Sequence, residues 1–309
     1  MTNNKSSKII DGKAIADNIK NEIAQQVKEI KQKFSITPTL AVILVGSDPA
    51  SEVYVGNKEK SAHFVGMNSM QFKFSDDINE IDLIKKINEL NSDNNVHGIL
   101  VQLPLPKHID SKNVIKAIDS AKDVDGFNII NVGKLSVGEL EGEDSAIIPC
   151  TPLGCLHLIK DAISKSSTYS TLVGLKALVI GTSNIVGRPM ARLLMLEGCT
   201  VTIANRSTRD LKSESLLADI VISATGVPNL IDASMIKKDA IIIDVGINRI
   251  NVGGNKTKIV GDVNFESAIT VASSITPVPG GVGPMTIAYL LKNTLKCCLK
   301  IINKSPKIN

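Results

Sequence analysis

The sequence predicts an α/β protein with two domains, each built on a parallel sheet with helices on its faces. Apolar, strand-like runs alternate with helix-period segments over most of the 309 residues. The alternation is interrupted by the polar segment 164–171 and then resumes. A glycine turn at Gly181 connects a strand to a helix in the second series, as in a Rossmann-like domain. With 43% hydrophobic residues, the chain has enough apolar side chains for two cores.

The first series of elements has clear boundaries. The run 39–46 is continuously apolar and ends in a glycine, which is typical of a buried parallel strand. Asp48-Pro49 predicts the start of the next helix, and Gly66 predicts its end. The other expected elements are helices over 12–33, 79–91 and 110–121, strands over 70–74 and 97–103, and a glycine-rich loop region over 123–149.

The second series begins after a helix that Thr151-Pro152 opens. Its expected strands are 175–180, 200–205, 219–224 and 240–246, and its expected helices are 187–197, 210–217 and 232–237. Residues 285–302 are apolar at helical spacing and predict a last helix. We therefore expect one domain over residues 1–150 and a second over residues 151–284.

Composition and charge argue against several classes of protein. The net charge is only +4, lysines are spread along the chain and aromatic residues make up 3%, which argues against nucleic-acid binding. The five cysteines lack Cys-x-x-Cys spacing and the four histidines are scattered, so we expect reduced thiols and no metal site. The polar N-terminus and the absence of a long apolar run predict a cytoplasmic protein that does not bind membranes.

Tyr54 and Lys58 lie four residues apart in the helix expected after Pro49. At this spacing both side chains lie on one helix face, together with Ala62 and Val65. Such a face desolvates a lysine, which lowers its pKa and permits proton transfer near neutral pH. Taken alone, the pair is better explained by a lysine that extends from a half-buried helix to solvent.

The glycine turn between Ile180 and Gly187 predicts a dinucleotide site. Gly181 permits a sharp turn, Gly187 permits close helix packing, and N–H groups at the helix start suit a pyrophosphate. The spacing is not Gly-x-Gly-x-x-Gly, and a turn without a ligand stays an alternative. Arg206 and Ser207 follow the next strand and suit a 2′-phosphate, which favours NADP over NAD; as an alternative, they are solvated loop residues.

Short-chain dehydrogenases also combine Tyr-x-x-x-Lys with a dinucleotide fold. In those enzymes the nucleotide loop lies near the N-terminus, and the pair follows it in the same domain. Here Tyr54 and Lys58 precede the loop and lie in a separate α/β series, which argues against that class.

Three further segments give Lys58 a chemical context. Gln102 lies at the carboxyl end of an expected strand, where ligands gather in open α/β sheets. Asp125 lies in the following loop, and the run 276–285 is stiffened by prolines and exposes glycine backbone. Each has an equally good structural explanation when taken alone: a strand-end amide, a turn residue and an interdomain hinge.

Taken together, the segments resemble the bifunctional methylenetetrahydrofolate dehydrogenase/methenyltetrahydrofolate cyclohydrolase family. The resemblance runs from about residue 8 to about residue 299. Its most specific parts are Gln-Leu-Pro-Leu-Pro at 102–106 and the proline-glycine run at 277–284. The other matching segments are 54–60, 123–127, 149–152, 181–189 and 244–248.

The resemblance implies a role for each site residue. Lys58 matches the catalytic lysine, Tyr54 the active-site tyrosine, Gln102 the glutamine that tunes the lysine, and Asp125 the aspartate that holds the pterin. Further implied folate contacts are Leu103, Pro277, Gly280 and Gly281, and implied NADP contacts are Gly181, Thr182, Ser183, Arg188, Arg206, Ser207 and Ile247. It also implies a homodimer, an active site between the two domains, and a C-terminal segment, 285–309, that completes the first domain.

The implied reaction has two steps. Hydride passes from 5,10-methylenetetrahydrofolate to NADP, which requires positioning more than a base. Water then opens the methenyl product to 10-formyltetrahydrofolate, and Lys58 is suited to mediate the proton transfers. A monofunctional dehydrogenase and a non-catalytic folate- or nucleotide-binding protein are alternatives, against which the Lys58–Gln102 pair argues. The implied metabolic context is purine, histidine and methionine biosynthesis.

Overall fold

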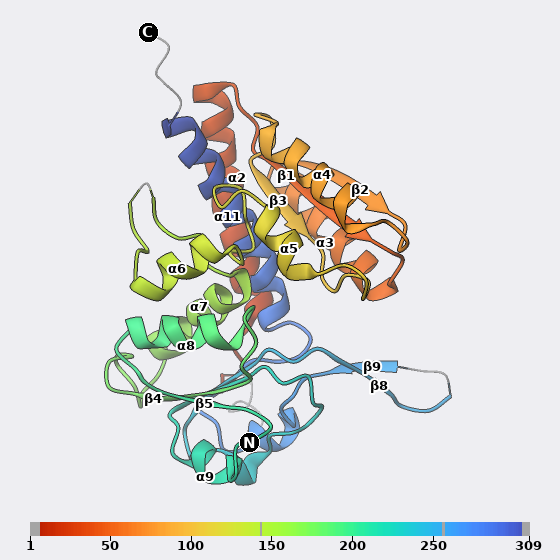
Figure 1. Cartoon of the computed structure of the whole chain (residues 1–309). Helices are drawn as coiled ribbons and strands as arrows, with labels where there is room; N and C mark the ends of the chain where they lie inside the picture. Colours follow the sequence, from red (N-terminus) through yellow and green to blue (C-terminus); the bar gives the residue numbers. More distant parts are fainter. Residues whose placement is uncertain (1–6, 143, 255–256, 305–309) are drawn as a thin grey trace. The chain divides into compact units, whose positions relative to one another are not determined.

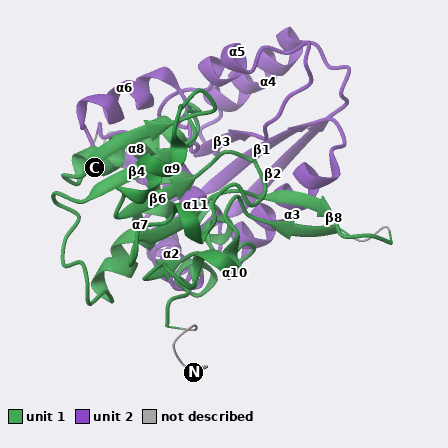
Figure 2. Cartoon of the chain, turned by 90° about the horizontal axis from the view of Figure 1, so that it is seen from below, with its two compact units in different colours: residues 1–16, 151–286 green, residues 17–150, 287–309 purple. Residues whose placement is uncertain are grey.

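The chain folds into two compact α/β units, shown in Figures 1 and 2. The computed structural model describes residues 7–142, 144–254 and 257–304. Unit 1 runs from Thr151 to Thr286 and includes the described residues up to Ala16. Unit 2 runs from Asp17 to Cys150 and includes the described residues from Ile287 onward.

The N-terminal segment packs with unit 1, although the sequence-based assignment places it with residues 17–150. Ile9 forms a parallel bridge with Ile275, and the Ile10 N–H donates to the Ile275 carbonyl at 2.9 Å. A Cβ at Gly12 would lie 2.0 Å from the carbonyl oxygen of Gly281, which shows how closely the two backbones approach. The boundaries of independently folding domains stay a prediction.

Unit 2 is built on a three-stranded parallel sheet in the order β2-β1-β3. The central strand β1 (Thr39–Val45) is buried along its whole length, as its uninterrupted apolar sequence predicts, and β2 (Asn68–Phe74) and β3 (Gly98–Val101) flank it. The helices are α2 (Gly12–Phe34), α3 (Pro49–Phe64), α4 (Glu80–Ser92), α5 (Ser111–Ala117), α6 (Ile129–Val137) and α11 (Val282–Lys304), of which α2 and α11 begin in unit 1.

Helix α6 lies in the segment 123–149, for which the expectation of a loop region is wrong. Asn128 caps the helix by accepting from the Ile130 N–H at 2.9 Å, and Gly138 ends it with a φ of 86°. The helix is only nine residues long and contains Gly133, which weakens the helical pattern in the sequence.

Unit 1 is built on a five-stranded parallel sheet in the order β10-β7-β6-β4-β5, which confirms the Rossmann-like arrangement. The inner strands are β4 (Lys176–Ile180), β6 (Ile220–Ser223) and β7 (Ile241–Asp244), and the outer strands are β5 (Thr200–Ala204) and β10 (Ser274–Ile275). The helices are α7 (Cys150–Ser164), α8 (Gly187–Leu196), α9 (Leu211–Leu216) and the short α10 (Phe265–Ala268).

Several elements of unit 1 differ from expectation. The sequence did not indicate β10 or the antiparallel hairpin of β8 (Asn248–Asn251) and β9 (Thr257–Val260), because these strands are short and the hairpin is partly polar. The helix expected over 232–237 is only a single 3-10 turn, η1 (Ala233–Met235), that Asp232 caps. Helix α11 begins at Val282, inside the proline-glycine run.

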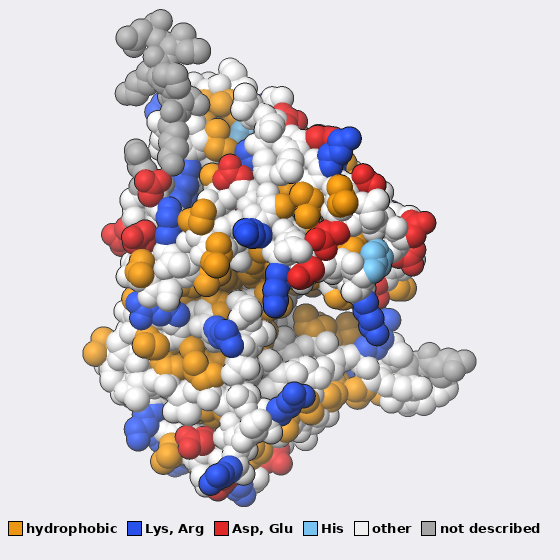
Figure 3. All heavy atoms as spheres, in the orientation of Figure 1, with side chains coloured by type: hydrophobic (Ala, Val, Ile, Leu, Met, Phe, Trp, Pro, Cys, Tyr) orange, Lys and Arg blue, Asp and Glu red, His pale blue; other side chains and the backbone are white. Residues whose placement is uncertain are grey.

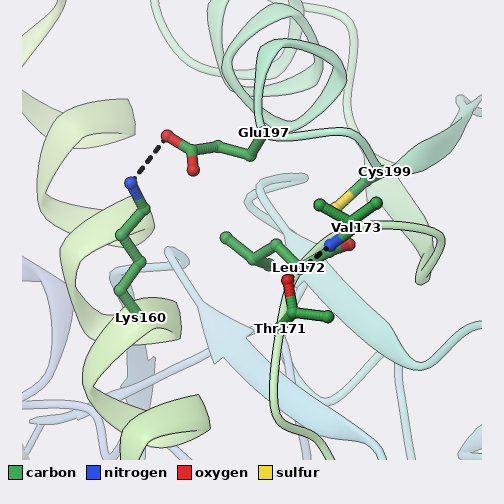
Figure 4. Close-up of polar contacts among 6 residues, drawn as sticks. All are labelled: Lys160, Thr171, Leu172, Val173, Glu197 and Cys199. Atoms are coloured by element: carbon green, nitrogen blue, oxygen red, sulfur yellow. Dashed lines mark hydrogen bonds and ion pairs between the residues drawn. The ribbon is translucent and has the colours of Figure 1, made fainter.

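Side-chain contacts fix the corner at which β5 begins, as Figure 4 shows. Lys160 of α7 forms an ion pair at 2.6 Å with Glu197, which follows α8. The Cys199 thiol donates to the Leu172 carbonyl at 3.3 Å. These contacts hold the turn before β4 next to the turn before β5, and β5 remains the outer strand of the sheet.

Candidate functional site

Helix α3 presents Lys58 on its buried face. The helix begins where Asp48 accepts from the Ser51 N–H at 2.8 Å, with Pro49 as its first residue. Lys58 is only 6% exposed, which is not compatible with a lysine that extends to solvent. Ala62 and Val65 are buried as expected, and Tyr54 is half-buried.

Gln102 is the hydrogen-bond partner of Lys58. The Lys58 ammonium donates to Gln102 Oε1 at 2.9 Å, and it lies 5.1 Å from the centroid of the Tyr54 ring. The Gln102 amide donates to the Leu103 carbonyl at 2.7 Å, which keeps Oε1 directed at Lys58. Burial lowers the pKa of Lys58, and the nearby Asp125 and Cys150 oppose that shift.

The loop after β3 carries two carboxylates with different surroundings. Asp123 is 1% exposed and accepts from the N–H groups of Gly126 and Asn128 and from the Asn131 amide. Its hydrogen bonds therefore stabilise the conformation of the loop. Asp125 keeps partial solvent access. Burial raises the pKa of Asp125 to about 6, while Lys58 lowers it and Asp123 raises it further. Asp125 is therefore the carboxylate available to a ligand.

Asn293 of α11 holds the backbone beside Asp125. Its buried amide donates to the carbonyls of Val124 at 2.8 Å and Ile148 at 2.9 Å. The Cys150 thiol also donates to the Val124 carbonyl, at 3.3 Å. Sequence reasoning missed Asn293, whose only signal is a polar residue within an apolar helix.

Unit 2 thus brings Tyr54, Lys58, Gln102, Leu103 and Asp125 into one group. The group combines an amine of lowered pKa, an amide that orients it and a carboxylate that accepts N–H groups. Such a set suits proton transfer on a substrate that itself carries N–H donors.

The loop after β4 fits a dinucleotide. Gly181 has a φ of 125°, and a Cβ there would lie 2.3 Å from the Ala224 carbonyl oxygen. A Cβ at Gly187 would lie 2.0 Å from the Gly181 carbonyl oxygen. Ser183 accepts from the Val186 N–H at 3.1 Å, immediately before α8. Glycine is thus required at both positions. The N–H groups of Val186 and Arg188 at the start of α8 bond to Ser183, so the glycine-rich turn itself is what places the backbone close to a pyrophosphate.

The remaining predicted nucleotide residues lie at the same edge of the sheet. Thr182, Ser183 and Arg188 are exposed around the start of α8. Arg206 and Ser207 are exposed in the turn after β5, whose last residue, Ala204, accepts from the Gly181 N–H at 2.9 Å. Ile247 is exposed in the loop after β7. These exposed side chains therefore lie at the sheet edge at which dinucleotides bind in doubly wound folds.

The proline-glycine run belongs to unit 1, unlike Lys58. Gly280 has a φ of 105°, and its carbonyl accepts from the Lys13 N–H at 2.9 Å. A Cβ at Gly281 would lie 2.6 Å from the Pro277 carbonyl oxygen. The structure therefore places Pro277, Gly280 and Gly281 in the unit that carries the nucleotide residues.

Three further features of the described residues concern metal-ligand groups, membrane-spanning helices and the distribution of charge on the surface. Among residues 7–142, 144–254 and 257–304, no group of three or more His, Cys, Asp or Glu side chains is arranged to hold a metal ion, and no helix has the length and apolarity to cross a membrane. On the face shown in Figure 3, lysines and arginines are scattered among acidic side chains.

Two family models together match most of the chain. The catalytic domain of tetrahydrofolate dehydrogenase/cyclohydrolase matches residues 10–125, and the NAD(P)-binding domain of the same family matches residues 149–301. Bifunctional protein FolD 1/3 of Ruegeria pomeroyi is 53% identical over 292 residues, which are 94% of this chain and 95% of the relative. Bifunctional protein FolD 1 of Acinetobacter baylyi is 53% identical over 291 residues, or 94% of each chain.

Solved structures share the same fold over nearly the whole chain. The bifunctional FolD enzyme from Campylobacter jejuni is 47% identical with a TM-score of 0.88, covering 94% of this chain and 98% of that one. The FolD enzyme of Trypanosoma brucei, solved with NADP cofactor and inhibitor, is 34% identical with a TM-score of 0.89, covering 95% and 98%. These similarities confirm the two-domain α/β fold.

Proposed function

This chain belongs to the tetrahydrofolate dehydrogenase/cyclohydrolase family, and we propose that Tyr54, Lys58, Gln102 and Asp125 carry its chemistry. The enzyme oxidises 5,10-methylenetetrahydrofolate to 5,10-methenyltetrahydrofolate with NADP and hydrolyses the product to 10-formyltetrahydrofolate. The observation that carries the proposal is the buried Lys58 amine bonded to Gln102 at 2.9 Å. Related proteins are named bifunctional, which favours both activities over a monofunctional dehydrogenase or a non-catalytic binding protein.

The dehydrogenase step depends on positioning. NADP accepts the hydride when bound, and no proton leaves the substrate. In our proposal Gly181, Thr182, Ser183 and Arg188 surround the pyrophosphate. Arg206 and Ser207 bind the 2′-phosphate, and the backbone at Ile247 contacts the nicotinamide. The exposed positions of these residues at one sheet edge support the assignment.

The hydrolytic step depends on Lys58. Its amine takes a proton from the water that adds to the methenyl carbon and returns one to the departing nitrogen. Gln102 orients the amine, and Tyr54 stacks on the folate. Asp125 accepts N–H groups of the pterin as an ionised carboxylate. Leu103, Pro277, Gly280 and Gly281 are proposed as further folate contacts.

The Lys58→Met variant tests this division of labour. We expect its cyclohydrolase rate to fall by about 10²–10⁴-fold, because the proton-transfer group is lost, while part of the dehydrogenase rate remains. Both activities are followed in one assay from methylenetetrahydrofolate and NADP, as reduced nicotinamide and as 10-formyl product. The control is Lys60→Met, an exposed lysine of the same helix, which should behave as wild type. An equal loss of both activities in Lys58→Met would show that the assignment is wrong.

We also propose that the enzyme is a cytoplasmic homodimer that supplies one-carbon units to purine, histidine and methionine biosynthesis. All five cysteines are unpaired and buried, which suits a reducing compartment. The outer strand β5 and the apolar side chains around it offer a surface for a second copy.

A further inference from the structure

Asp262, which follows β9, is a fully buried carboxylate that joins two loops. Its Oδ2 accepts from the N–H groups of Thr225 at 2.6 Å and Gly226 at 3.2 Å, and from the Thr225 hydroxyl at 3.0 Å. Its Oδ1 accepts from the Asn248 amide at 2.9 Å. Thr225 and Gly226 follow β6, and Asn248 begins β8 after the loop that leaves β7, so one side chain ties the loop after β6 to the loop after β7.

Asp244, the last residue of β7, binds the backbone of Asp262. The Asp244 carboxylate accepts from the N–H groups of Asp262 at 2.9 Å and Gly246 at 3.0 Å. The packing leaves no spare room: a Cβ at Gly246 would lie 2.1 Å from Asp262 Oδ1, and one at Gly261 would lie 1.8 Å from Asp244 Oδ2. Two interlocking carboxylates therefore fix Gly246 and Asn248, the residues on either side of Ile247.

We infer that Asp262 is a positioning residue for the nicotinamide end of NADP, which it affects by binding the Asn248 side chain after Ile247 and packing against Gly246 before it. The inference rests on the proposed contact between Ile247 and the cofactor. The tethered loops follow the carboxyl ends of β6 and β7, the edge where dinucleotides bind in doubly wound sheets. Ile247 itself is 57% exposed, so packing of its side chain contributes little to its position.

The Asp262→Asn substitution changes the hydrogen bonds of the side chain and keeps its size and shape nearly unchanged. A carboxylate accepts at both oxygens, whereas an amide accepts at one end and donates at the other. If the amide oxygen faces Thr225 and Gly226, the new NH2 group faces the NH2 group of Asn248. That bond is lost, and the loop carrying Ile247 is released from the loop after β6.

For Asp262→Asn we expect the KM for NADP and the Kd for NADP, measured by calorimetry, to rise about tenfold, as the loss of a charge-assisted hydrogen bond allows. The cyclohydrolase rate, measured from methenyltetrahydrofolate without NADP, should stay within about twofold of wild type. General damage to the fold would lower both activities.

The double variant Asp262→Asn with Asn248→Asp is the rescue. The amide placed at position 262 donates to the carboxylate placed at position 248, and the net charge is unchanged. NADP affinity should return most of the way to the wild-type value. A merely structural role of the buried charge at Asp262 does not predict this recovery.

Asp219→Asn is the matched control at the opposite edge of the same sheet. Asp219 precedes β6 and accepts from the Lys176 N–H at 2.9 Å and the Lys237 ammonium at 2.6 Å. Its loss should lower thermal stability without changing the Kd for NADP.

The inference is overturned if Asp262→Asn binds NADP normally, or if Asp219→Asn weakens NADP binding equally. If Asp262→Asn does not fold, Asn248→Ala removes the same amide bond and must weaken NADP binding, or the inference fails. Wild-type enzyme in the same assays distinguishes a failure of the proposed function from a failure of the inference about Asp262. An inactive wild type that does not bind NADP refutes the proposed function together with the inference, whereas an active one with a normal Asp262→Asn variant refutes the inference alone.

Discussion

Two opposed effects set the pKa values of Lys58 and Asp125. Burial disfavours both charges, and their mutual attraction favours both. Burial is the larger effect for each, so the pKa of Lys58 falls while that of Asp125 rises to about 6. Near neutral pH, Asp125 remains mostly ionised and able to accept N–H groups, beside an amine that releases its proton more readily than a solvated lysine.

A pH profile tests the role of Asp125. Its pKa of about 6 lies above the usual value, so lowering the pH through 6 converts the carboxylate to a neutral acid. We expect kcat/KM of the cyclohydrolase to fall over that range, because the neutral acid accepts pterin N–H groups less well. Asp125→Asn should have a low kcat/KM at every pH and lack the inflection near 6. An unchanged inflection in that variant would assign it to another group.

A double substitution tests the proposed 2′-phosphate site. Replacing Arg206 and Ser207 with alanine should raise the KM for NADP about tenfold and leave the KM for NAD nearly unchanged, because only NADP carries the 2′-phosphate. Steady-state kinetics with both cofactors provide the measurement. Arg209→Ala, an exposed arginine of the same loop, is the control and should have little effect. Equal effects on the two cofactors would contradict the assignment.

Motif spacing indicated Tyr54, Lys58 and Gln102 because their residue types and strand-end or helix-face positions are visible in the sequence. The different surroundings of Asp123 and Asp125 were not visible, since they depend on which carboxylate the loop buries. Asn293 and Asp262 were missed for a related reason. Their partners are distant in sequence, and a buried polar residue has no periodic pattern.

At the scale of elements, continuous apolar runs such as β1 and β4 were predicted well because strands buried on both faces consist almost wholly of aliphatic residues. The hairpin β8–β9 was not predicted, because its residues are partly polar and its strands have only four residues each. The start of α11 was placed too late, since Gly283 and Pro284 suggest a loop although Pro284 is tolerated in the first turn of a helix.

Helix α3 permits a direct stability test at Gly56. Nothing lies within 4 Å of a Cβ built there, so Gly56→Ala should raise the free energy of unfolding by about 0.5–1 kcal/mol through helix propensity alone. The position lies roughly opposite the Tyr54–Lys58 face, and the KM for folate should not change. Denaturant unfolding gives the free energy, and Gly133→Ala in α6, also unobstructed, should behave similarly. A loss of stability at Gly56 would show that its backbone conformation needs glycine.

At the scale of the whole molecule, each unit is assembled from distant parts of the chain. Unit 1 takes in the segment around Ile10, and unit 2 takes in most of α11. The family resemblance implied that the C-terminal helix completes the first domain, whereas the placement of the N-terminal segment in unit 1 depends on pairing such as that of Ile9 with Ile275, which linear patterns do not show. Deleting the described residues around Ile10, or the last turns of α11 up to Ile302, would therefore remove side chains from the core of a unit.

The outer strand β5 is the basis of our prediction that the enzyme is a dimer. Ile203 on β5 and the neighbouring Val173, Met195 and Leu196 are all exposed apolar side chains, and an uncovered strand edge of this kind favours a second copy. Wild-type enzyme should have about twice the 33.0 kDa chain mass in sedimentation or light scattering. Ile203→Lys should shift it towards the monomer, because a charge on each copy would be buried at the contact. Ile81→Lys, at a more exposed isoleucine on α4 in unit 2, should remain dimeric. A monomeric wild type would refute the dimer, and a dimeric Ile203→Lys would place the contact elsewhere.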